Sequence, residues 1–128
     1  MKILIAGEGG QGVQTVAKIL AQSAFTEGQE VTYIPNFGVE QRGGLSIAFV
    51  IIDSKPIAYP KFKTADVLAI LTEKAMSRVK NYQGKQTKIL KNSSNLALLE
   101  ELVKETKIIK LTTLKMITEK ILGNKLKK

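Results

Sequence analysis

The stretch Ile3–Val13, with the sequence ILIAGEGGQGV, joins a short apolar segment to a glycine-rich turn. Its first four residues are apolar, which is the length and composition of a buried parallel strand. Four of the next six positions are glycine. Apolar residues then recur at helical spacing as far as Ala24, so one face of a helix would be apolar. The stretch therefore predicts a strand, a tight turn and the start of a helix.

The glycines of this turn fit the pattern G-x-G-x-x-G at Gly7, Gly9 and Gly12. Glycine lets the chain turn sharply and leaves backbone N–H groups exposed at the positive end of the helix dipole. Such a helix start binds phosphate or carboxylate without a basic side chain. Gly10 and Gln11 complete the turn, and the Gln11 amide is a further candidate donor to an anion. The alternative is a tight connection without a ligand, in which Gln11 is an ordinary exposed polar residue.

A dinucleotide site needs one residue that this chain lacks. An Asp or Glu at the end of the second strand normally holds the ribose hydroxyls. The expected second strand, Glu30–Ile34, runs into Pro35 and Asn36, and its only acid stands at its start. The sequence therefore disfavours NAD as a ligand. Glu8, inside the turn, is an unfavourable neighbour for a phosphate, which favours a partner-facing or structural role for the turn.

Length and composition indicate a single domain over residues 1–128. A hydrophobic content of 44% and a charged content of 24% are typical of a globular protein, and no apolar run reaches transmembrane length. The first residues predict a strand in place of a signal peptide, so we expect a cytoplasmic protein. Cysteine and histidine are both absent, which excludes disulfides, cysteine-held iron–sulfur clusters and the usual zinc sites. We therefore expect no metal site and no catalytic residue in this chain.

The net charge of +9 raises the question of a nucleic-acid partner. Eleven of the 18 lysines follow Gly84, but the chain has only two arginines and few aromatic residues. The lysines are also spread over several expected elements in place of one stripe. The sequence therefore favours a lysine-rich surface that faces an acidic partner or ligand, with neither nucleic acid nor membrane as a partner.

A second glycine-containing segment, Asn36–Gly44, lies between two expected strands. Its candidate site residues are Phe37, Gly38, Glu40, Arg42, Gly43 and Gly44. The planar fork of Arg42 suits a phosphate or a partner carboxylate, and the alternative is an internal ion pair with Glu40. Gly43 and Gly44 would let a ligand or subunit approach closely, or would begin the next strand with a bulge.

The rest of the chain alternates expected strands and helices. Strands are expected at Leu45–Ile52, Val67–Leu71, Thr87–Leu90 and Lys107–Lys110, with Ile57–Tyr59 as an antiparallel partner formed through the turn Asp53–Pro56. Four helices are expected. The first ends near Gly28, and the second starts at a Thr72 cap. The third spans about Leu96–Lys104, and the fourth runs from a Thr112 or Thr113 cap to Gly123-Asn124. This pattern predicts an α/β fold, a Rossmann-like three-layer α/β/α sandwich with a mixed, mostly parallel sheet. Ligands bind beyond the carboxyl ends of such strands, so the two glycine segments should line one crevice.

Four segments, in this order, resemble the gamma subunit of the 2-oxoacid:ferredoxin oxidoreductases. They are Gly7–Val13, Phe37–Gly44, Lys55–Ile57 and Ala65–Leu68. The family includes the pyruvate, 2-ketoisovalerate, 2-oxoglutarate and indolepyruvate enzymes. The resemblance extends from Met1 to about Leu71. Compared with the family pattern, the C-terminal half is shortened, and Phe37 and Val39 stand where Tyr and often Pro are usual.

This resemblance implies a non-catalytic subunit of a heteromeric complex that converts a 2-oxoacid and coenzyme A into acyl-CoA and carbon dioxide and reduces ferredoxin. Its partners would be alpha and beta subunits, with a delta subunit as an optional member. Thiamine diphosphate and iron–sulfur clusters would lie on those partners, and this chain alone would bind no cofactor. The two glycine segments would contact coenzyme A, another anion or a neighbouring subunit. The alternatives are a stand-alone nucleotide-binding protein and, behind it, a basic nucleic-acid-binding module.

Overall fold

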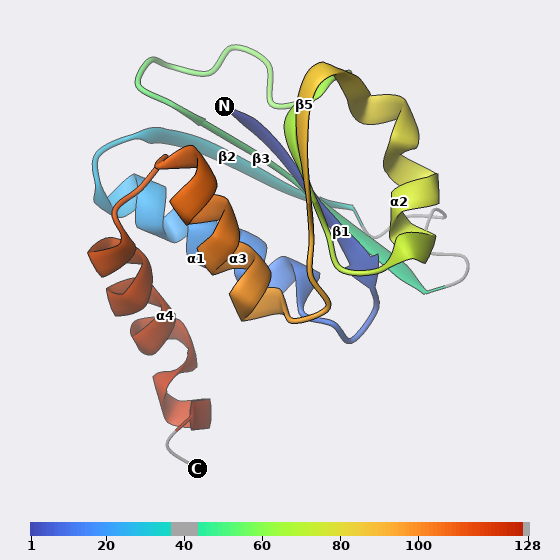
Figure 1. The fold of residues 1–128 in the computed structure, drawn as a ribbon. Helices are drawn as coiled ribbons and strands as arrows, with labels where there is room; N and C mark the ends of the chain where they lie inside the picture. The colour runs from blue at the N-terminus through green and yellow to red at the C-terminus, as the bar shows by residue number, and fades with distance from the viewer. Residues whose placement is uncertain (37–43, 127–128) are drawn as a thin grey trace.

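The computed structural model describes residues 1–36 and 44–126, which form a five-stranded sheet with helices on both faces (Figure 1). The strands are β1 (Lys2–Glu8), β2 (Glu30–Asn36), β3 (Leu45–Asp53), β4 (Ala65–Ile70) and β5 (Gln83–Lys91). Their order across the sheet is β2-β3-β1-β4-β5. β3 is antiparallel to both of its neighbours, whereas β1, β4 and β5 are mutually parallel. Four strands therefore run one way and β3 alone runs against them, which confirms the predicted mixed, mostly parallel sheet.

The apolar stretch that begins the chain is the central strand of this sheet. Side chains alternate between the two faces of a strand, so Ile3 and Ile5 enter one core while Leu4 and Ala6 enter the other. All four are at most 1% exposed. β1 is buried on both faces because helices cover both faces of the sheet.

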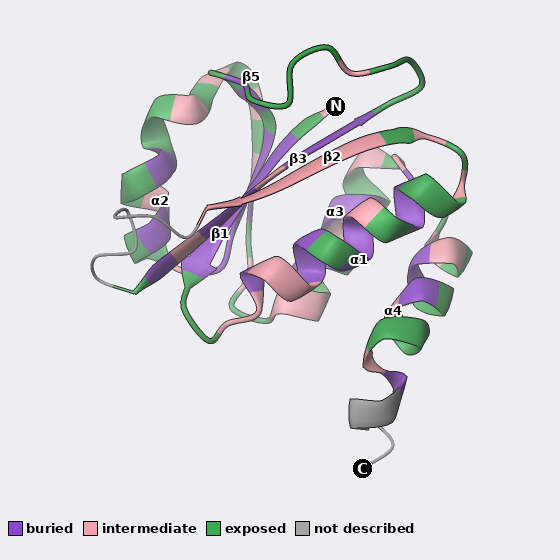
Figure 2. Ribbon diagram, turned by 180° about the vertical axis from the view of Figure 1, so that it is seen from behind, coloured by how far each residue is buried: buried purple, intermediate pink, exposed green. Residues whose placement is uncertain are grey.

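The helices lie in two layers of unequal thickness (Figures 1 and 2). They are α1 (Val13–Thr26), α2 (Glu73–Val79), α3 (Asn95–Thr106) and α4 (Leu111–Leu126), with a short 3-10 helix at Lys80–Tyr82. α1 and α3 cover one face, and α4 packs on both of them. α2 covers the other face together with Phe62 from the β3–β4 connection. Figure 2 shows the buried side of α1 turned toward the sheet.

The predicted strand Ile57–Tyr59 is wrong, and so is the hairpin turn before it. The connection between β3 and β4 contains no strand. Both edges of β3 are already paired, one with β1 and the other with β2, so no edge is left for a further strand. The antiparallel hairpin of this fold is instead β2–β3.

The predicted strand Lys107–Lys110 is also wrong. Lys107 has φ of 53° and ends α3 in the left-handed conformation. The backbone groups of the next residues bond to side chains that directly follow α1. The Ile108 carbonyl accepts from Gln29 Nε2, and the Lys110 N–H donates to Glu27 Oε2, both at 2.8 Å. These contacts hold the α3–α4 connection against the end of α1. The backbone groups that they use are then not available for pairing with a strand of the sheet.

The last helix differs from the prediction at both ends. α4 begins at Leu111, so Thr112 and Thr113 lie within its first turn in place of capping it, and the helix continues past Gly123 to Leu126. The Leu114 N–H bonds to the Lys110 carbonyl at 3.0 Å, which places the helix start ahead of the threonines. Within residues 1–36 and 44–126, no helix has both the length and the apolar content needed to cross a bilayer.

Candidate ligand site at the carboxyl ends of the strands

The turn between β1 and α1 holds its shape through its backbone and one side chain. Gly10 and Gly12 have φ of 89° and 82°, in the left-handed region that other residues rarely adopt. The Gln11 N–H donates to the Glu8 carbonyl at 3.1 Å, and Gln11 Oε1 accepts from the Glu8 N–H at 2.7 Å. Gln11 therefore closes the turn, a role that neither sequence interpretation of this residue included.

The first turn of α1 has no side-chain cap. Gly12 occupies the N-cap position, so no side-chain oxygen there accepts from the first N–H groups of the helix, those of Val13, Gln14 and Thr15. The turn also contains no acidic residue. The positive end of the helix dipole therefore meets neither a capping oxygen nor a carboxylate of its own first turn, and its N–H groups suit an anion.

The start of β3 lies directly beside this turn. The Gly9 N–H donates to the Gly44 carbonyl, and a Cβ added at Gly9 would stand only 3.1 Å from that oxygen. The pairing of β1 with β3 extends to Glu8 and Leu45 at the same place. Glycine at position 9 thus lets two chain segments approach closely, and the structure brings Gly9 and Gly44 together.

Gln14 fixes the position of α1 against the β2–β3 hairpin, and sequence reasoning missed it. Its Nε2 donates to Ser46 Oγ at 2.9 Å and to the Ile47 carbonyl at 3.0 Å, while its Oε1 accepts from the Tyr33 hydroxyl at 2.5 Å. Burial raises the pKa of Tyr33, so its hydroxyl stays protonated and donates at neutral pH. No signal in the sequence separates Gln14 from Thr15, the polar residue that follows it.

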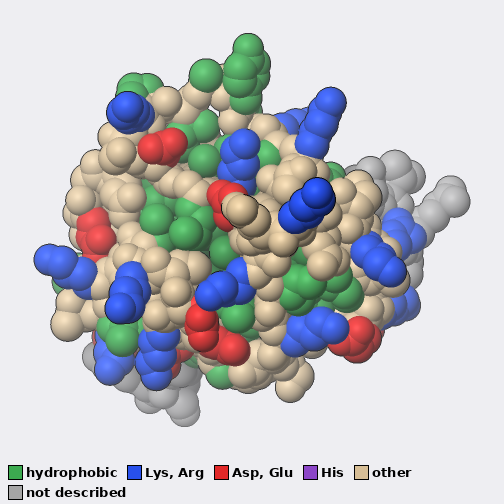
Figure 3. Space-filling model, turned by 45° about the horizontal axis from the view of Figure 1, so that its top comes forward, with side chains coloured by type: hydrophobic (Ala, Val, Ile, Leu, Met, Phe, Trp, Pro, Cys, Tyr) green, Lys and Arg blue, Asp and Glu red, His purple; other side chains and the backbone are tan. Residues whose placement is uncertain are grey.

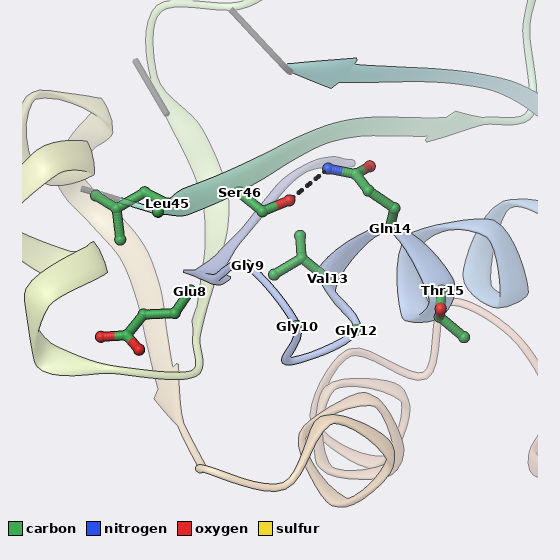
Figure 4. Close-up of a pocket in the computed structure, with 10 residues that line it drawn as sticks. Glu8, Gly9, Gly10, Gly12, Val13, Gln14, Thr15, Leu45 and Ser46 are labelled. Atoms are coloured by element: carbon green, nitrogen blue, oxygen red, sulfur yellow. Dashed lines mark hydrogen bonds between the residues drawn. The ribbon is translucent and has the colours of Figure 1, made fainter. Parts of the chain in front are cut away.

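A hollow of about 460 Å³ opens between the glycine turn, the start of α1 and the start of β3 (Figure 4). Its lining residues are Glu8, Gly9, Gly10, Gly12, Val13, Gln14, Thr15, Gly44, Leu45 and Ser46. Figure 4 shows the Glu8 carboxylate directed away from Gln14 and Thr15, on the other side of the turn. Glu8, which the sequence analysis judged unfavourable for a bound phosphate, therefore directs its carboxylate away from the start of α1.

The remaining predicted site residues divide into two groups. Gly7 is buried, and a Cβ there would lie 2.9 Å from Leu71 side-chain atoms, so this glycine serves the packing of β1. Phe37, Gly38, Glu40, Arg42 and Gly43 lie outside the described residues, and so does the proposed Arg42–Glu40 ion pair.

Glu8 is the one acidic side chain among the described residues that line the hollow. Within the described ranges, no three His, Cys, Asp or Glu residues come together as a metal site would require. The two carboxyl groups with a lowered pKa are both exposed: Asp53 accepts from the Lys55 backbone N–H, and Glu100 accepts from the Lys104 side chain. Neither lines the hollow. The described part of the site is suited to binding and orienting a ligand.

On the face shown in Figure 3, the described basic side chains form no single stripe. Lys and Arg side chains are scattered there with Asp and Glu among them. Three lysines form exposed ion pairs, Lys88 with Glu105, Lys91 with Glu73 and Lys104 with Glu100. This distribution does not favour a groove that would follow a nucleic-acid backbone.

Residues 2–127 match the model of the family described as pyruvate ferredoxin/flavodoxin oxidoreductase. The pyruvate/ketoisovalerate oxidoreductases common subunit gamma of Pyrococcus furiosus is 36% identical over 131 residues, which cover 96% of this chain and 69% of that protein. The ketoisovalerate oxidoreductase subunit VorA of Methanothermobacter thermautotrophicus is 40% identical over 76 residues, 59% of this chain and 16% of that protein. The chain thus spans about two thirds of one relative and about a sixth of the other.

Solved structures share the fold. The pyruvate oxidoreductase subunit PORC of Thermotoga maritima superposes with a TM-score of 0.78 at 18% identity, covering 94% of this chain and 84% of that one. The 2-oxoglutarate:ferredoxin oxidoreductase of Magnetococcus marinus, with 2-oxoglutarate, coenzyme A and succinyl-CoA bound, gives 0.74 at 19% identity over 98% of this chain and 27% of that one.

Proposed function

The chain belongs to the pyruvate ferredoxin/flavodoxin oxidoreductase family, and from this premise we propose that it is the gamma-type subunit of a 2-oxoacid:ferredoxin oxidoreductase. The assembled enzyme would convert a 2-oxoacid and coenzyme A into acyl-CoA and carbon dioxide and reduce ferredoxin. It would act in the cytoplasm. The observation that carries the proposal is the open helix start of α1, which faces the hollow with no cap and no acid in its first turn.

The redox and decarboxylation chemistry would lie on partner chains. The sequence has no cysteine and no histidine, and the described residues hold no cluster of metal ligands. The chain therefore does not fit an iron–sulfur cluster. In the proposed complex, alpha, beta and any delta subunits would hold the clusters and thiamine diphosphate, and this chain would bind no cofactor of its own.

The part proposed for this chain is to help form the coenzyme A site. Coenzyme A carries several phosphates, and the uncapped N–H groups of Val13, Gln14 and Thr15 are suited to one of them. Gly9 and Gly44 hold the two sides of the hollow together. The proposed contact residues are Gly7, Gly9, Gly10, Gln11, Gly12, Phe37, Gly38, Glu40, Arg42, Gly43 and Gly44, with Gly7 and Gln11 acting through the shape of the turn.

Native co-purification tests the proposal. A tag on this chain should bring down larger chains that carry thiamine diphosphate and iron–sulfur chromophores. The purified assembly should reduce ferredoxin only when both a 2-oxoacid and coenzyme A are present. A chain that purifies alone, with no cluster-bearing partner, would contradict the proposal. Tight binding of NAD or ATP by that lone chain would then favour a stand-alone nucleotide-binding protein.

A further inference from the structure

The two edges of the sheet differ in their protection against pairing with another strand. Three exposed lysines lie on β5: Lys85, Lys88 and Lys91. The pairing of β5 with β4 is also interrupted by a register shift. Lysines and irregular pairing are common means of keeping a sheet edge unpaired. β2 has neither, because it pairs with β3 in unbroken register and its centre, Val31–Ile34, carries no charge.

Hydrogen bonds at Ile52 show which backbone groups of β2 point outward. The Ile52 N–H donates to the Met1 carbonyl at 3.0 Å, and the Ile52 carbonyl accepts from the Met1 amino group at 2.5 Å. Both groups point toward β1, so the partner of Ile52 in β2, Val31, turns its own N–H and carbonyl away from β3. Alternation gives Tyr33 and Pro35 the same outward direction. An outward position on an edge strand is where proline is tolerated.

These outward groups are self-complementary about Thr32. In an antiparallel pair of two β2 strands centred on Thr32, Val31 of each copy lies opposite Tyr33 of the other. Each of these residues offers an outward N–H and carbonyl, so every outward N–H in the pair finds an acceptor. A pair centred on Tyr33 would set Val31 opposite Pro35, which has no N–H, but Tyr33 would then pair with itself, so both registers satisfy every outward N–H of β2. The Thr32 side chain therefore has to decide between the two registers.

The Thr32 side chain also lacks a hydrogen-bond partner in the described part of a single chain. Its Oγ1 is buried and has no hydrogen-bond partner among the described residues. At the centre of the pair, the two Thr32 side chains would stand directly opposite in the position where cross-strand side chains come closest. Threonines paired across strands exchange hydroxyl hydrogen bonds. A second copy would supply the missing partner once the Thr32 side chain rotates, because Oγ1 is covered by the chain's own atoms in the single copy.

An apolar groove borders β2 on the face of the sheet covered by α1. Its lining residues are Lys18, Ala21, Gln22, Phe25, Val31, Tyr33 and Ile121, and its volume is about 450 Å³. Phe25 is 68% exposed and Ile121 is 39% exposed. A strand added beside β2 would carry its own α1 next to this groove and remove Phe25 from water, which is a favourable change.

Charge permits this contact between two basic chains. The chain as a whole carries +9, but β2 has one acid, Glu30, and the groove has one cation, Lys18. Two copies joined along β2 would therefore meet on nearly neutral surfaces, with charges of opposite sign at the margin. The lysine-rich β5 edge would stay far from the contact, at the other side of the sheet.

We propose that two copies of this chain pair through β2, antiparallel and about a twofold axis at Thr32, to form one continuous ten-stranded sheet with the grooves around Phe25 closed against each other. The contact is isologous and therefore closes at two copies. It joins gamma-type chains to each other and goes beyond the proposed role of each chain within the oxidoreductase.

Cysteine cross-linking tests the register directly, because the natural chain contains no cysteine. In the proposed pair, the Cα atoms at position 32 stand about 4.5 Å apart, within the range that a disulfide spans. Thr32→Cys should cross-link rapidly under mild oxidation, and its rate should fall on dilution to the monomer. Gln86→Cys places the same thiol at an exposed position of β5 and should cross-link much more slowly. Equal rates for the two variants would overturn the proposal.

Sedimentation of the unmodified chain supplies the second measurement. The wild-type chain should reach a dimer as concentration rises. Thr32→Lys should weaken that dimer by at least about tenfold, since two ammonium groups would meet at the axis. Gln86→Lys adds the same charge to β5 and should leave it unchanged. A chain that stays monomeric at all concentrations, or a dimer indifferent to Thr32→Lys, overturns the proposal. A monomer that still co-purifies with cluster-bearing chains would leave the proposed function intact.

Discussion

The turns that lead into α1 and α2 leave the same end of the sheet. They differ in how the first backbone N–H groups of the helix are satisfied. At the start of α2, Thr72 Oγ1 accepts from the Ala75 N–H at 3.2 Å, and Glu73 places a carboxylate in the first turn. At the start of α1, Gly12 has no side chain, and no acid follows it. α3 resembles α2, since Ser94 Oγ accepts from the Ala97 N–H at 3.5 Å.

This difference separates a turn that completes the fold from a turn that can serve a ligand. A capping oxygen and a nearby carboxylate satisfy the helix N–H groups and repel an anion. The glycine turn leaves those groups uncapped. It is stabilised instead by glycines in the left-handed conformation, by close packing and by the hydrogen bonds of Gln14. We therefore expect the glycine turn to be intolerant of substitution at its backbone, and the capped turns to depend on a single side chain.

The largest effect should come from Gly12→Ala. The residue has φ of 82°, and an added Cβ would lie 2.3 Å from Asn95 Nδ2. The left-handed conformation should lower the free energy of unfolding by about 1–2 kcal/mol, measured by urea denaturation, and moving the end of the Asn95 side chain aside should add to that loss. Gly28→Ala is the matched control, because Gly28 has φ of 84° but nothing within 4 Å of the added atom. It should cost about 1 kcal/mol. Equal losses would show that the Asn95 contact is unimportant.

Gln14→Ala should have the next largest effect. The change removes three hydrogen bonds that tie α1 to β2 and β3 and leaves the Ser46 and Tyr33 hydroxyls without this partner. The expected loss is about 2 kcal/mol in the same urea assay. Gln22→Ala, on an exposed position of the same helix, should change stability by less than about 0.5 kcal/mol. A Gln14→Ala chain as stable as Gln22→Ala would contradict the anchoring role.

Removing the caps should give smaller losses. Thr72→Ala should lower stability by about 1 kcal/mol, and Thr72→Ser should restore most of it because the capping oxygen returns. Ser94→Ala should cost less than Thr72→Ala, since the Ser94 contact is longer at 3.5 Å. Thermal unfolding followed by circular dichroism would rank the three. A larger loss for Ser94→Ala than for Thr72→Ala would show that the length of the capping hydrogen bond does not determine how much the cap stabilises the chain.

The smallest effect should be a dependence on alkaline pH from Tyr33. Burial raises the pKa of its phenol above the unfolded value of about 10, and its proton donates to Gln14. This stabilisation is fully present below about pH 10 and is lost as the pH rises through the folded pKa. Urea unfolding at a series of pH values should show the alkaline loss weakened in Tyr33→Phe. Tyr59→Phe, at a position 81% exposed, should behave like the parent.

The sequence predicted the β1–α1 unit and the Thr72 cap because both depend on neighbouring residues. The apolar run of β1, the glycines after it and the helical spacing are local signals, and they also carry the family resemblance. The predicted strand Ile57–Tyr59 is wrong because β2, the strand before β3 in the chain, already pairs with the edge of β3 that Ile57–Tyr59 would need. The contacts of Gln14 are between distant residues, so no local pattern shows them. Phe37–Gly43 remain predictions, outside the described residues.

The most direct test of the account is the coenzyme A dependence of the complex purified through this chain. Thr15 lines the hollow in the first turn of α1, so Thr15→Asp would give α1 the acid that α2 already has. The isolated variant should be as stable as the parent or slightly more stable. In the assembled enzyme it should raise the KM for coenzyme A about tenfold, equivalent to about 1.4 kcal/mol, with the KM for the 2-oxoacid unchanged. The neutral variant Thr15→Asn should stay near the wild type. Equal KM values for the two variants would contradict an anion site at the glycine turn.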